Sequence, residues 1–380
     1  MKSRKQLNVA MIGQGFMGRA HSNAFHQVGH FCESSYDLRL KVICGRNQAQ
    51  LKEMATRWGW EETADDWKAV VERKDVDAID ICTPNFLHAP IAIAAAQAGK
   101  IVLCEKPLAL TVEEAERMAE AARKVPNLVW FNYRRVPAIA LAKQLVDEGR
   151  LGQIYHYRAT YLQSWGADPA SPDAWRFKAS EAGSGAMGDL LSHSIDLALM
   201  LNSTVDEVSA LVHTFTPGRE VDDAAFMLAR FANGSIGSFE ATRFAIGCRN
   251  RNYFEIHGAT GAIRFDLEDL NRLHVFDGND RAGLQGSHNV LVTGPGHPYT
   301  SDFWPPGHIL GYEHTFILTL ANFLKSLERD ETFHANFQDA VEVQRVLQAV
   351  TESDRTRSWA NSAATVNQCT KDRSLVRSTN

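Results

Sequence analysis

The sequence lacks the features that mark a membrane protein or a disulfide-bonded secreted protein. No uninterrupted run reaches the roughly 18 apolar residues that a spanning helix needs, and the first apolar run, residues 7–12, is too short for a signal peptide. The six cysteines include no C-x-x-C pair, which favours buried thiols over disulfides or a zinc site. We therefore expect a cytoplasmic protein.

An excess of positive charge is also absent. The net charge is −5 and the basic residues are scattered along the chain, so we expect neither a nucleic acid nor a membrane as a partner. The histidines show no metal-ligand spacing, and we expect no metal. A chain of 380 residues is too long for one ordinary core, which predicts two domains.

Short apolar runs alternate with helix-like patterns over the first third of the chain. The predicted strands are residues 7–12, 38–44, 78–83, 101–105 and 128–132, and the predicted helices are residues 19–28, 48–58, 67–72, 89–98 and 112–124. Such alternation is typical of βαβ units around a parallel sheet, and their right-handed crossovers make the sheet doubly wound. The sequence therefore predicts an α/β first domain of Rossmann type, residues 1–132.

The pattern changes at about Tyr133. One helix-like segment, residues 138–148, precedes a series of alternating runs: residues 153–162, 205–215, 224–231, 235–243, 253–257, 262–265 and 274–276. Alternation of this kind predicts a mostly antiparallel open sheet with one covered face. Two more helices are predicted at residues 312–327 and 337–354. We therefore expect an α+β second domain, residues 133–360, and a polar tail, residues 361–380.

A glycine-rich turn follows the first predicted strand. Gly13, Gly15 and Gly18 have the spacing G-x-G-x-x-G, with Phe16 and Met17 inside the motif, and a helix-like pattern follows. The first glycine permits a tight turn, the second lets the backbone approach a pyrophosphate, and the third allows close packing of helix and strand. The phosphate then meets the free amides at the start of the helix. This turn predicts a nicotinamide dinucleotide in the first domain.

The choice of dinucleotide depends on the end of the second strand. An acidic residue there favours NAD, whereas an arginine favours the 2′-phosphate of NADP. This chain has Gly45 and Arg46 at that position and no carboxylate. Arg46 also fits a solvated surface position. The sequence therefore predicts NAD or NADP as the cofactor, with NADP at least accepted.

Four motifs together resemble the glucose–fructose oxidoreductase / inositol dehydrogenase (Gfo/Idh/MocA) family. They are residues 9–18, residues 80–85 with His88, residues 105–107, and residues 183–196. Smaller features, including residues 131–135, are most similar to the levoglucosan and pyranoside 3-dehydrogenase group of that family. The resemblance covers roughly residues 7–355.

The resemblance implies a Rossmann domain and an α/β domain whose open sheet forms a homo-oligomer, a dimer or a tetramer. It also implies NAD(P)-dependent oxidation of a secondary hydroxyl of a sugar or cyclitol, here at the 3-position of a levoglucosan-like pyranose or anhydrosugar. Besides the glycine-rich turn, Gly45 and Arg46, the expected cofactor contacts are Thr83, Pro84, Asn85, His88, Glu105 and Lys106.

Three residues fit the chemistry of alcohol oxidation, which needs a base within reach of the hydroxyl. Lys106 ends the fourth βα unit at the carboxyl edge of the sheet, where doubly wound folds bind ligands, and the following Pro107 fits a cis bond. Asp189 and His193 are four residues apart and share a helix face. We predict that His193 is the base, that Asp189 accepts a substrate hydroxyl and tunes His193, and that Lys106 orients or relays. The resemblance leaves the base open between Lys106 and His193.

The expected sugar site combines aromatic faces with hydrogen-bonding groups. In addition to Asp189 and His193, the predicted substrate contacts are Asn132, Tyr133, Arg134, Tyr161, Gln163, Trp165, Trp175, Arg176 and Tyr312.

Three other functions fit parts of the pattern. An inositol 2-dehydrogenase or an NAD-dependent glycosidase uses the same architecture, and the glycosidase retains its cofactor instead of releasing NADH. A non-catalytic ligand sensor on the same fold is expected to lose Lys106 or the Asp189–His193 pair, and this chain keeps all three.

Overall fold

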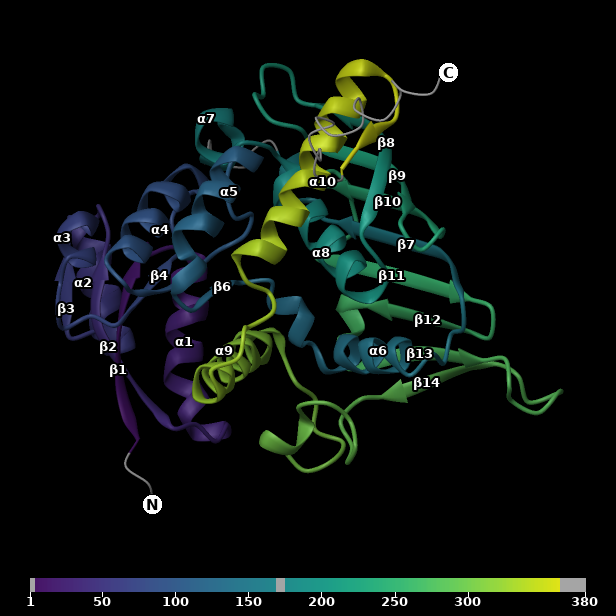
Figure 1. Cartoon of the computed structure of the whole chain (residues 1–380), viewed down its shortest axis with the longest axis horizontal. Coiled ribbons are helices and arrows are strands. Elements are labelled where there is room, and N and C mark those ends of the chain that lie inside the picture. Colours follow the sequence, from purple (N-terminus) through teal and green to yellow (C-terminus); the bar gives the residue numbers. More distant parts are fainter. Residues whose placement is uncertain (1–3, 169–174, 363–380) are drawn as a thin grey trace, which may run out of the picture.

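Two β-sheets stand side by side, with helices between them (Figure 1). The computed structural model describes residues 4–168 and 175–362. Within these ranges no helix is both long and apolar enough to cross a membrane.

The first sheet has six parallel strands in the order β3-β2-β1-β4-β5-β6. Its strands are β1 (Lys5–Ile12), β2 (Tyr36–Cys44), β3 (Glu62–Ala64), β4 (Ala78–Ile81), β5 (Ile101–Cys104) and β6 (Asn127–Val129). Its helices are α1 (Phe16–Phe31), α2 (Gln48–Trp58), α3 (Trp67–Val71), α4 (His88–Gln97) and α5 (Val112–Ala121). This strand order is that of the Rossmann fold and confirms the prediction of a doubly wound first domain.

Strand β3 was not predicted from the sequence. Its three residues, Glu62–Ala64, are exposed or half-buried and contain no apolar run. By contrast, β4 is buried at all four positions, as expected for a central strand of a parallel sheet.

The second sheet has nine strands in the order β14-β13-β12-β11-β7-β10-β9-β8-β15. They are β7 (Ile154–Leu162), β8 (Val205–His213), β9 (Ala224–Phe231), β10 (Ile236–Thr242), β11 (Arg251–Gly258), β12 (Gly261–Asp266), β13 (Arg272–Asp277), β14 (Ser287–Leu291) and β15 (Ala360–Asn361). Only β7 and β10 pair in parallel, so the prediction of a large, mostly antiparallel sheet is confirmed. The exposed strand β14 and the two-residue β15 were missed.

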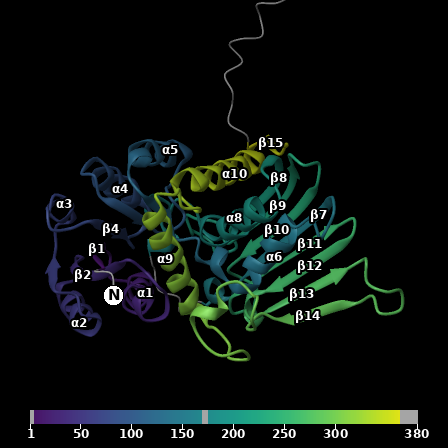
Figure 2. The ribbon, with the colours of Figure 1, turned by 60° about the horizontal axis from the view of Figure 1, so that its bottom comes forward.

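Helices cover the side of the large sheet that faces the first domain (Figures 1 and 2). They are α6 (Pro137–Asp147), α8 (Ser192–Leu201) and α10 (Phe337–Thr356). The short helix α7 (Ala179–Ala182) lies near α5 at the top of Figure 1.

Helix α9 (Tyr312–Arg329) returns to the first domain and packs along α1. Its Phe316 and Leu320 share a buried cluster with Val9 and Met11 of β1. The domain limits at residues 132 and 360 therefore remain predictions, because a late helix completes the early core. Most of the predicted polar tail, residues 363–380, lies outside the described residues.

Candidate active site

A cleft of about 1420 Å³ lies between the carboxyl ends of the first sheet and the second domain. It exceeds the roughly 300–1,000 Å³ typical of a small-ligand site, and it therefore has room for a dinucleotide beside a second molecule. Carboxyl ends of parallel strands are where open α/β folds bind ligands.

The glycine-rich turn forms one wall of this cleft. Gly13 has φ +119°, and a Cβ there would lie 2.4 Å from the Cys82 carbonyl oxygen, so only glycine fits. A Cβ at Gly15 would meet nothing within 4 Å, which leaves its backbone open to the cleft. Gly18 packs against the turn, since its Cβ would lie 3.0 Å from the Gly13 carbonyl oxygen. Gly13 and Gly18 thus have the turn and packing constraints expected of them, and Gly15 leaves room for a ligand beside its backbone.

These surroundings fit a dinucleotide. Helix α1 begins at Phe16, next to the cleft, with Gly15 as an N-cap that has no side chain and with no acidic residue in the first turn, so no side chain compensates its free amides. The buried Gln14 Oε1 and Thr83 Oγ1 also line the cleft, and neither has a hydrogen-bond partner among the described residues.

Most of the predicted cofactor residues line the cleft. They are Gly13, Gly15, Phe16, Met17, Gly45, Arg46, Thr83, Pro84, Asn85, Glu105 and Lys106. His88 does not line it. Its Nδ1 and Nε2 lie 3.0 and 3.1 Å from the carbonyl oxygens of Pro107 and Thr83, so this buried ring ties two cleft loops together. His88 was expected to contact the cofactor, but it supports the cleft loops instead. Gly18 also does not line the cleft and packs behind the glycine-rich turn.

Two carboxylates that the sequence pattern did not indicate lie at the Arg46 end of the cleft. Asp65 and Asp66 follow β3 directly and line the cleft with Arg46. Asp66 also caps α3, because its side chain accepts from the Lys68 N–H. Two carboxylates therefore lie one strand away from the end of β2, where the sequence has none.

Lys106 and Asp189 form an ion pair at the opposite end of the cleft. Lys106 Nζ donates to Asp189 Oδ1 at 2.9 Å and to the Asp189 carbonyl oxygen at 2.8 Å. Arg243 Nη2 donates to the other carboxylate oxygen at 2.9 Å. Asp189 is the centre of a π-helical turn, Met187–Leu191, just before α8. Lys106 precedes a cis bond to Pro107, as predicted.

His193, near the start of α8, lies beside this pair and lines the cleft. Its ring packs against Tyr133 with the two ring centroids 4.6 Å apart. Burial and the positive charge of Lys106 lower the pKa of His193 well below its ordinary value, although Asp189 opposes the shift. His193 is therefore neutral at pH 7.

Aromatic and amide side chains form the rest of the Lys106 end of the cleft. Tyr133 and Tyr161 hydroxyls lie 3.0 Å apart, and Tyr161 donates to Asn250 Oδ1 at 2.8 Å. Gln163 donates to the same oxygen at 2.7 Å and accepts from Trp165 Nε1 at 2.6 Å. The predicted residues that line the cleft here are Asn132, Tyr133, Tyr161, Gln163, Trp165, Trp175, Arg176, Asp189, His193 and Tyr312.

Arg134 was predicted to contact the substrate, but it does not line the cleft. Its guanidinium is buried and donates to both oxygens of Asp196 in α8, the shortest distance being 2.6 Å. A second carboxylate, Asp339 of α10, lies 3.5 Å away. Arg134 therefore fastens the segment after β6 to two helices and does not face a ligand.

Arg243 and Asn250 line the cleft but were not predicted as site residues from the sequence. Arg243 is only 1% exposed and lines the cleft, and its guanidinium lies 4.6 Å from the centroid of the Trp165 ring. Its Nε and Nη1 have no hydrogen-bond partner in the part of the chain that the structure describes. A buried donor of this kind needs an acceptor. The only signal in the sequence was its place at the end of a predicted strand.

One group of residues in the described ranges has the composition of a metal site. His21, Asp80 and Cys82 have ligand atoms within 4.8 Å of one another. The three already bond to one another, and the expectation of no metal stays a prediction.

The fold and the cleft define a dinucleotide-dependent oxidoreductase. Residues 7–133 match the family described as an oxidoreductase family with an NAD-binding Rossmann fold, and residues 139–264 match the Gfo/Idh/MocA C-terminal domain. The chain is 41% identical to levoglucosan dehydrogenase of Pseudarthrobacter phenanthrenivorans, in an alignment covering 94% of this chain and 98% of the relative.

Solved structures of similar proteins support the same assignment. An oxidoreductase domain protein from Kribbella flavida has a TM-score of 0.92 at 44% identity, covering 95% of this chain and all of the other. A levoglucosan dehydrogenase in complex with NADH and levoglucosan has a TM-score of 0.92 at 42% identity, covering 94% and 99%. The chain belongs to the Gfo/Idh/MocA family and is an NAD-dependent dehydrogenase.

Proposed function

We propose that the protein oxidises a secondary hydroxyl of a levoglucosan-like anhydrosugar or pyranose, at the 3-position, with NAD as the preferred cofactor. The observation that carries the proposal is the Lys106–Asp189 pair beside a neutral, buried His193 at one end of a dinucleotide-sized cleft. The relationship to levoglucosan dehydrogenase supports the choice of sugar.

A nicotinamide cofactor held by the glycine-rich turn and Thr83 would supply the acceptor for the hydride of the substrate carbon. His193 is unprotonated at neutral pH and takes the hydroxyl proton. The Lys106 ammonium, held by Asp189, orients the hydroxyl oxygen and stabilises the negative charge that develops there.

Arg243 holds Asp189 through its Nη2 and packs on the Trp165 ring, so it positions two residues that line the sugar end of the cleft. The rings of Trp165 and Trp175 supply apolar surface for the sugar faces. Both carboxylate oxygens of Asp189 already bind cations, and its acceptance of a substrate hydroxyl remains a prediction.

The preference for NAD rests on Asp65 and Asp66 at the Arg46 end. Carboxylates near the adenosine ribose disfavour a 2′-phosphate, whereas Arg46 favours it. The earlier prediction that NADP is accepted stays open to test, with NAD used more efficiently.

The open face of the large sheet is proposed as the contact of a homo-oligomer. Leu211, Phe226, Leu228 and Ile236, on three adjacent strands, are all 41% to 58% exposed. No helix in the described ranges covers this face (Figure 2), and exposed apolar patches of this kind mark interaction sites.

A cytoplasmic location also remains a proposal, supported by the five described cysteines, which are all free.

The substrate prediction is tested by NADH formation with levoglucosan, glucosides and inositols. Levoglucosan or a glucoside is expected to give the highest kcat/KM, with net release of NADH. Arg243→Gln should lower kcat/KM for the sugar by about 10- to 100-fold, the value of hydrogen bonds to a charged group. The control Arg329→Gln changes a surface arginine at the end of α9 that does not line the cleft. Inositol as the best substrate, or hydrolysis without NADH release, would contradict the proposal.

The pH dependence tests His193. Because its pKa is lowered, kcat/KM should stay constant through neutral pH and fall only in acid, well below the usual histidine range. His193→Asn should reduce kcat by about 10²- to 10⁴-fold and abolish that acid limb. Lys106→Met removes a charge that lowers this pKa, so any residual activity should show the limb at higher pH. A fall of kcat/KM at the ordinary histidine pKa in the wild type argues against His193 as the base.

Cofactor selectivity is tested by comparing kcat/KM for NAD and NADP. The wild type should favour NAD. Asp65→Ser should raise the relative efficiency with NADP by about tenfold, the effect of removing one nearby like charge, and Arg46→Ala should lower it. The control Glu53→Ser changes an exposed carboxylate of α2 that does not line the cleft. Preference of the wild type for NADP would refute the role given to Asp65.

The oligomer is tested by sedimentation. The wild type should be a dimer or tetramer at micromolar concentration, and Leu228→Glu should dissociate it, since a charge would be buried at the contact. Glu313→Gln on α9, away from this face, is the control. A monomeric wild type would rule out the proposed contact.

A further inference from the structure

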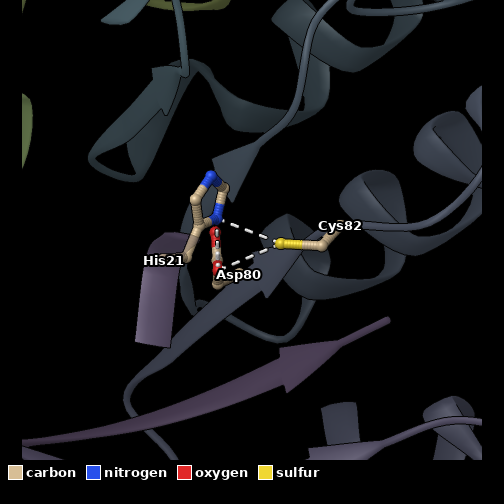
Figure 3. Close-up of side chains that lie close together, drawn as sticks. All are labelled: His21, Asp80 and Cys82. Atoms are coloured by element: carbon tan, nitrogen blue, oxygen red, sulfur yellow. Dashed lines mark hydrogen bonds and ion pairs between the residues drawn. The ribbon is translucent and has the colours of Figure 1, made fainter. Parts of the chain in front are cut away.

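A buried charged cluster lies behind the catalytic end of the cleft. His21 of α1 has no exposed surface, and its Nδ1 lies 2.9 Å from Asp80 Oδ2. Its Nε2 lies 3.0 Å from Glu105 Oε1. Figure 3 shows the imidazole directly over the Asp80 carboxylate, with the Cys82 sulfur at its side. The ring therefore has a carboxylate at each nitrogen.

The number of protons follows from this geometry. A neutral imidazole donates from one nitrogen only, so one carboxylate would face a lone pair inside the protein. Burial alone would lower the pKa of His21, but the charge of Asp80 and the hydrogen bonds of Asp80 and Cys82 raise it well above its ordinary value. Trp130 stacks on the ring at a centroid distance of 4.1 Å, which suits a cation. The two carboxylates and the stacked ring therefore both favour an imidazolium at His21.

Asp80 and Cys82 make further hydrogen bonds inside the cluster. Asp80 Oδ1 accepts from Trp130 Nε1 at 2.9 Å, while Oδ2 accepts from the Cys82 thiol. Burial and the charge of Asp80 raise the pKa of the Cys82 thiol, so it stays protonated. Two carboxylates and one imidazolium leave a single net negative charge.

Glu105 connects this cluster to the catalytic residue. Its Oε2 accepts from the backbone N–H of Lys106 at 3.0 Å, and Glu105 lines the cleft. His21 and the Lys106 amide thus hold the two oxygens of one carboxylate. A change in the ring charge would move both the Glu105 carboxylate and the turn that carries Lys106.

We propose that His21 is a positioning residue for the dehydrogenase reaction: as an imidazolium it fixes Glu105 and the Lys106 turn, and the net negative charge of the cluster favours the oxidised, cationic nicotinamide over the reduced, neutral one. The redox ring must lie beside the substrate residues Lys106 and His193, which is the end of the cleft that Glu105 lines. This inference rests on the proposed dehydrogenase function.

The charge on His21 is tested by NMR of the chain labelled with ¹⁵N-histidine and free of cofactor. The signals are assigned with His21→Gln. Both ring nitrogens should carry protons at a pH above 8, where an ordinary histidine with a pKa of about 6.5 is neutral. Asp80→Asn should allow the ring to lose one proton in that range. A single N–H on His21 of the wild type at neutral pH overturns the proposal.

The effect on the cofactor is tested by calorimetric binding of NAD⁺ and NADH in the absence of sugar. Glu105→Gln should lower the preference for NAD⁺ over NADH by about tenfold, as expected for one unit charge removed at close range. The control Glu116→Gln changes an exposed carboxylate that pairs with Arg345. An unchanged ratio in Glu105→Gln overturns the electrostatic part. Because neither measurement needs turnover, a failure of sugar oxidation would be separate from a failure here.

Discussion

The ion pair between Lys106 and Asp189 is the interaction on which the site depends. Lys106 comes from the carboxyl edge of the first sheet and Asp189 from the turn before α8 in the second domain. The two side chains are partly buried, and a charge that loses water is costly unless it is paired, so each side chain is more favourable in its place with the other. Arg243 completes the arrangement by binding the second oxygen of Asp189. The chemistry of the cleft thus exists only when the two domains are together.

A second buried pair holds the same junction from behind. Arg134 follows β6, and Asp196 lies one turn beyond His193 on α8. Breaking such a pair by removing one partner costs about 3–5 kcal/mol, because the remaining charge is left buried. Because Arg134 is held in this buried pair, it has no access to the cleft, although the sequence suggested a substrate contact. Arg134 fixes α8, and α8 carries His193.

Local patterns predicted the parts of the structure that depend on neighbours in sequence. Apolar runs and glycine spacing indicated the buried strands and the turn at Gly13, since burial and backbone conformation leave a periodic trace. The three-residue β3 left none, and with it Asp65 and Asp66 were missed. Arg243 was missed for another reason: its partner Asp189 is far away in sequence, and no local pattern reports which polar side chains converge. The strict helical spacing assumed for Asp189 and His193 also differed, because Asp189 lies in a π-helical turn.

The charges at the catalytic end form two opposed walls. Lys106, Arg176 and Arg243 lie around the single carboxylate of Asp189, which leaves this wall positive. The cluster of Asp80, His21 and Glu105 behind the cleft is the one for which we propose a net negative charge. Negative charge that develops on a hydroxyl oxygen as its proton leaves is therefore stabilised by the first wall. The second wall favours a cationic ring, so it promotes cofactor binding in the oxidised state but opposes loss of that charge during the reaction. The two proposed charge effects thus act on opposite partners of the reaction, and they come from residues of both domains.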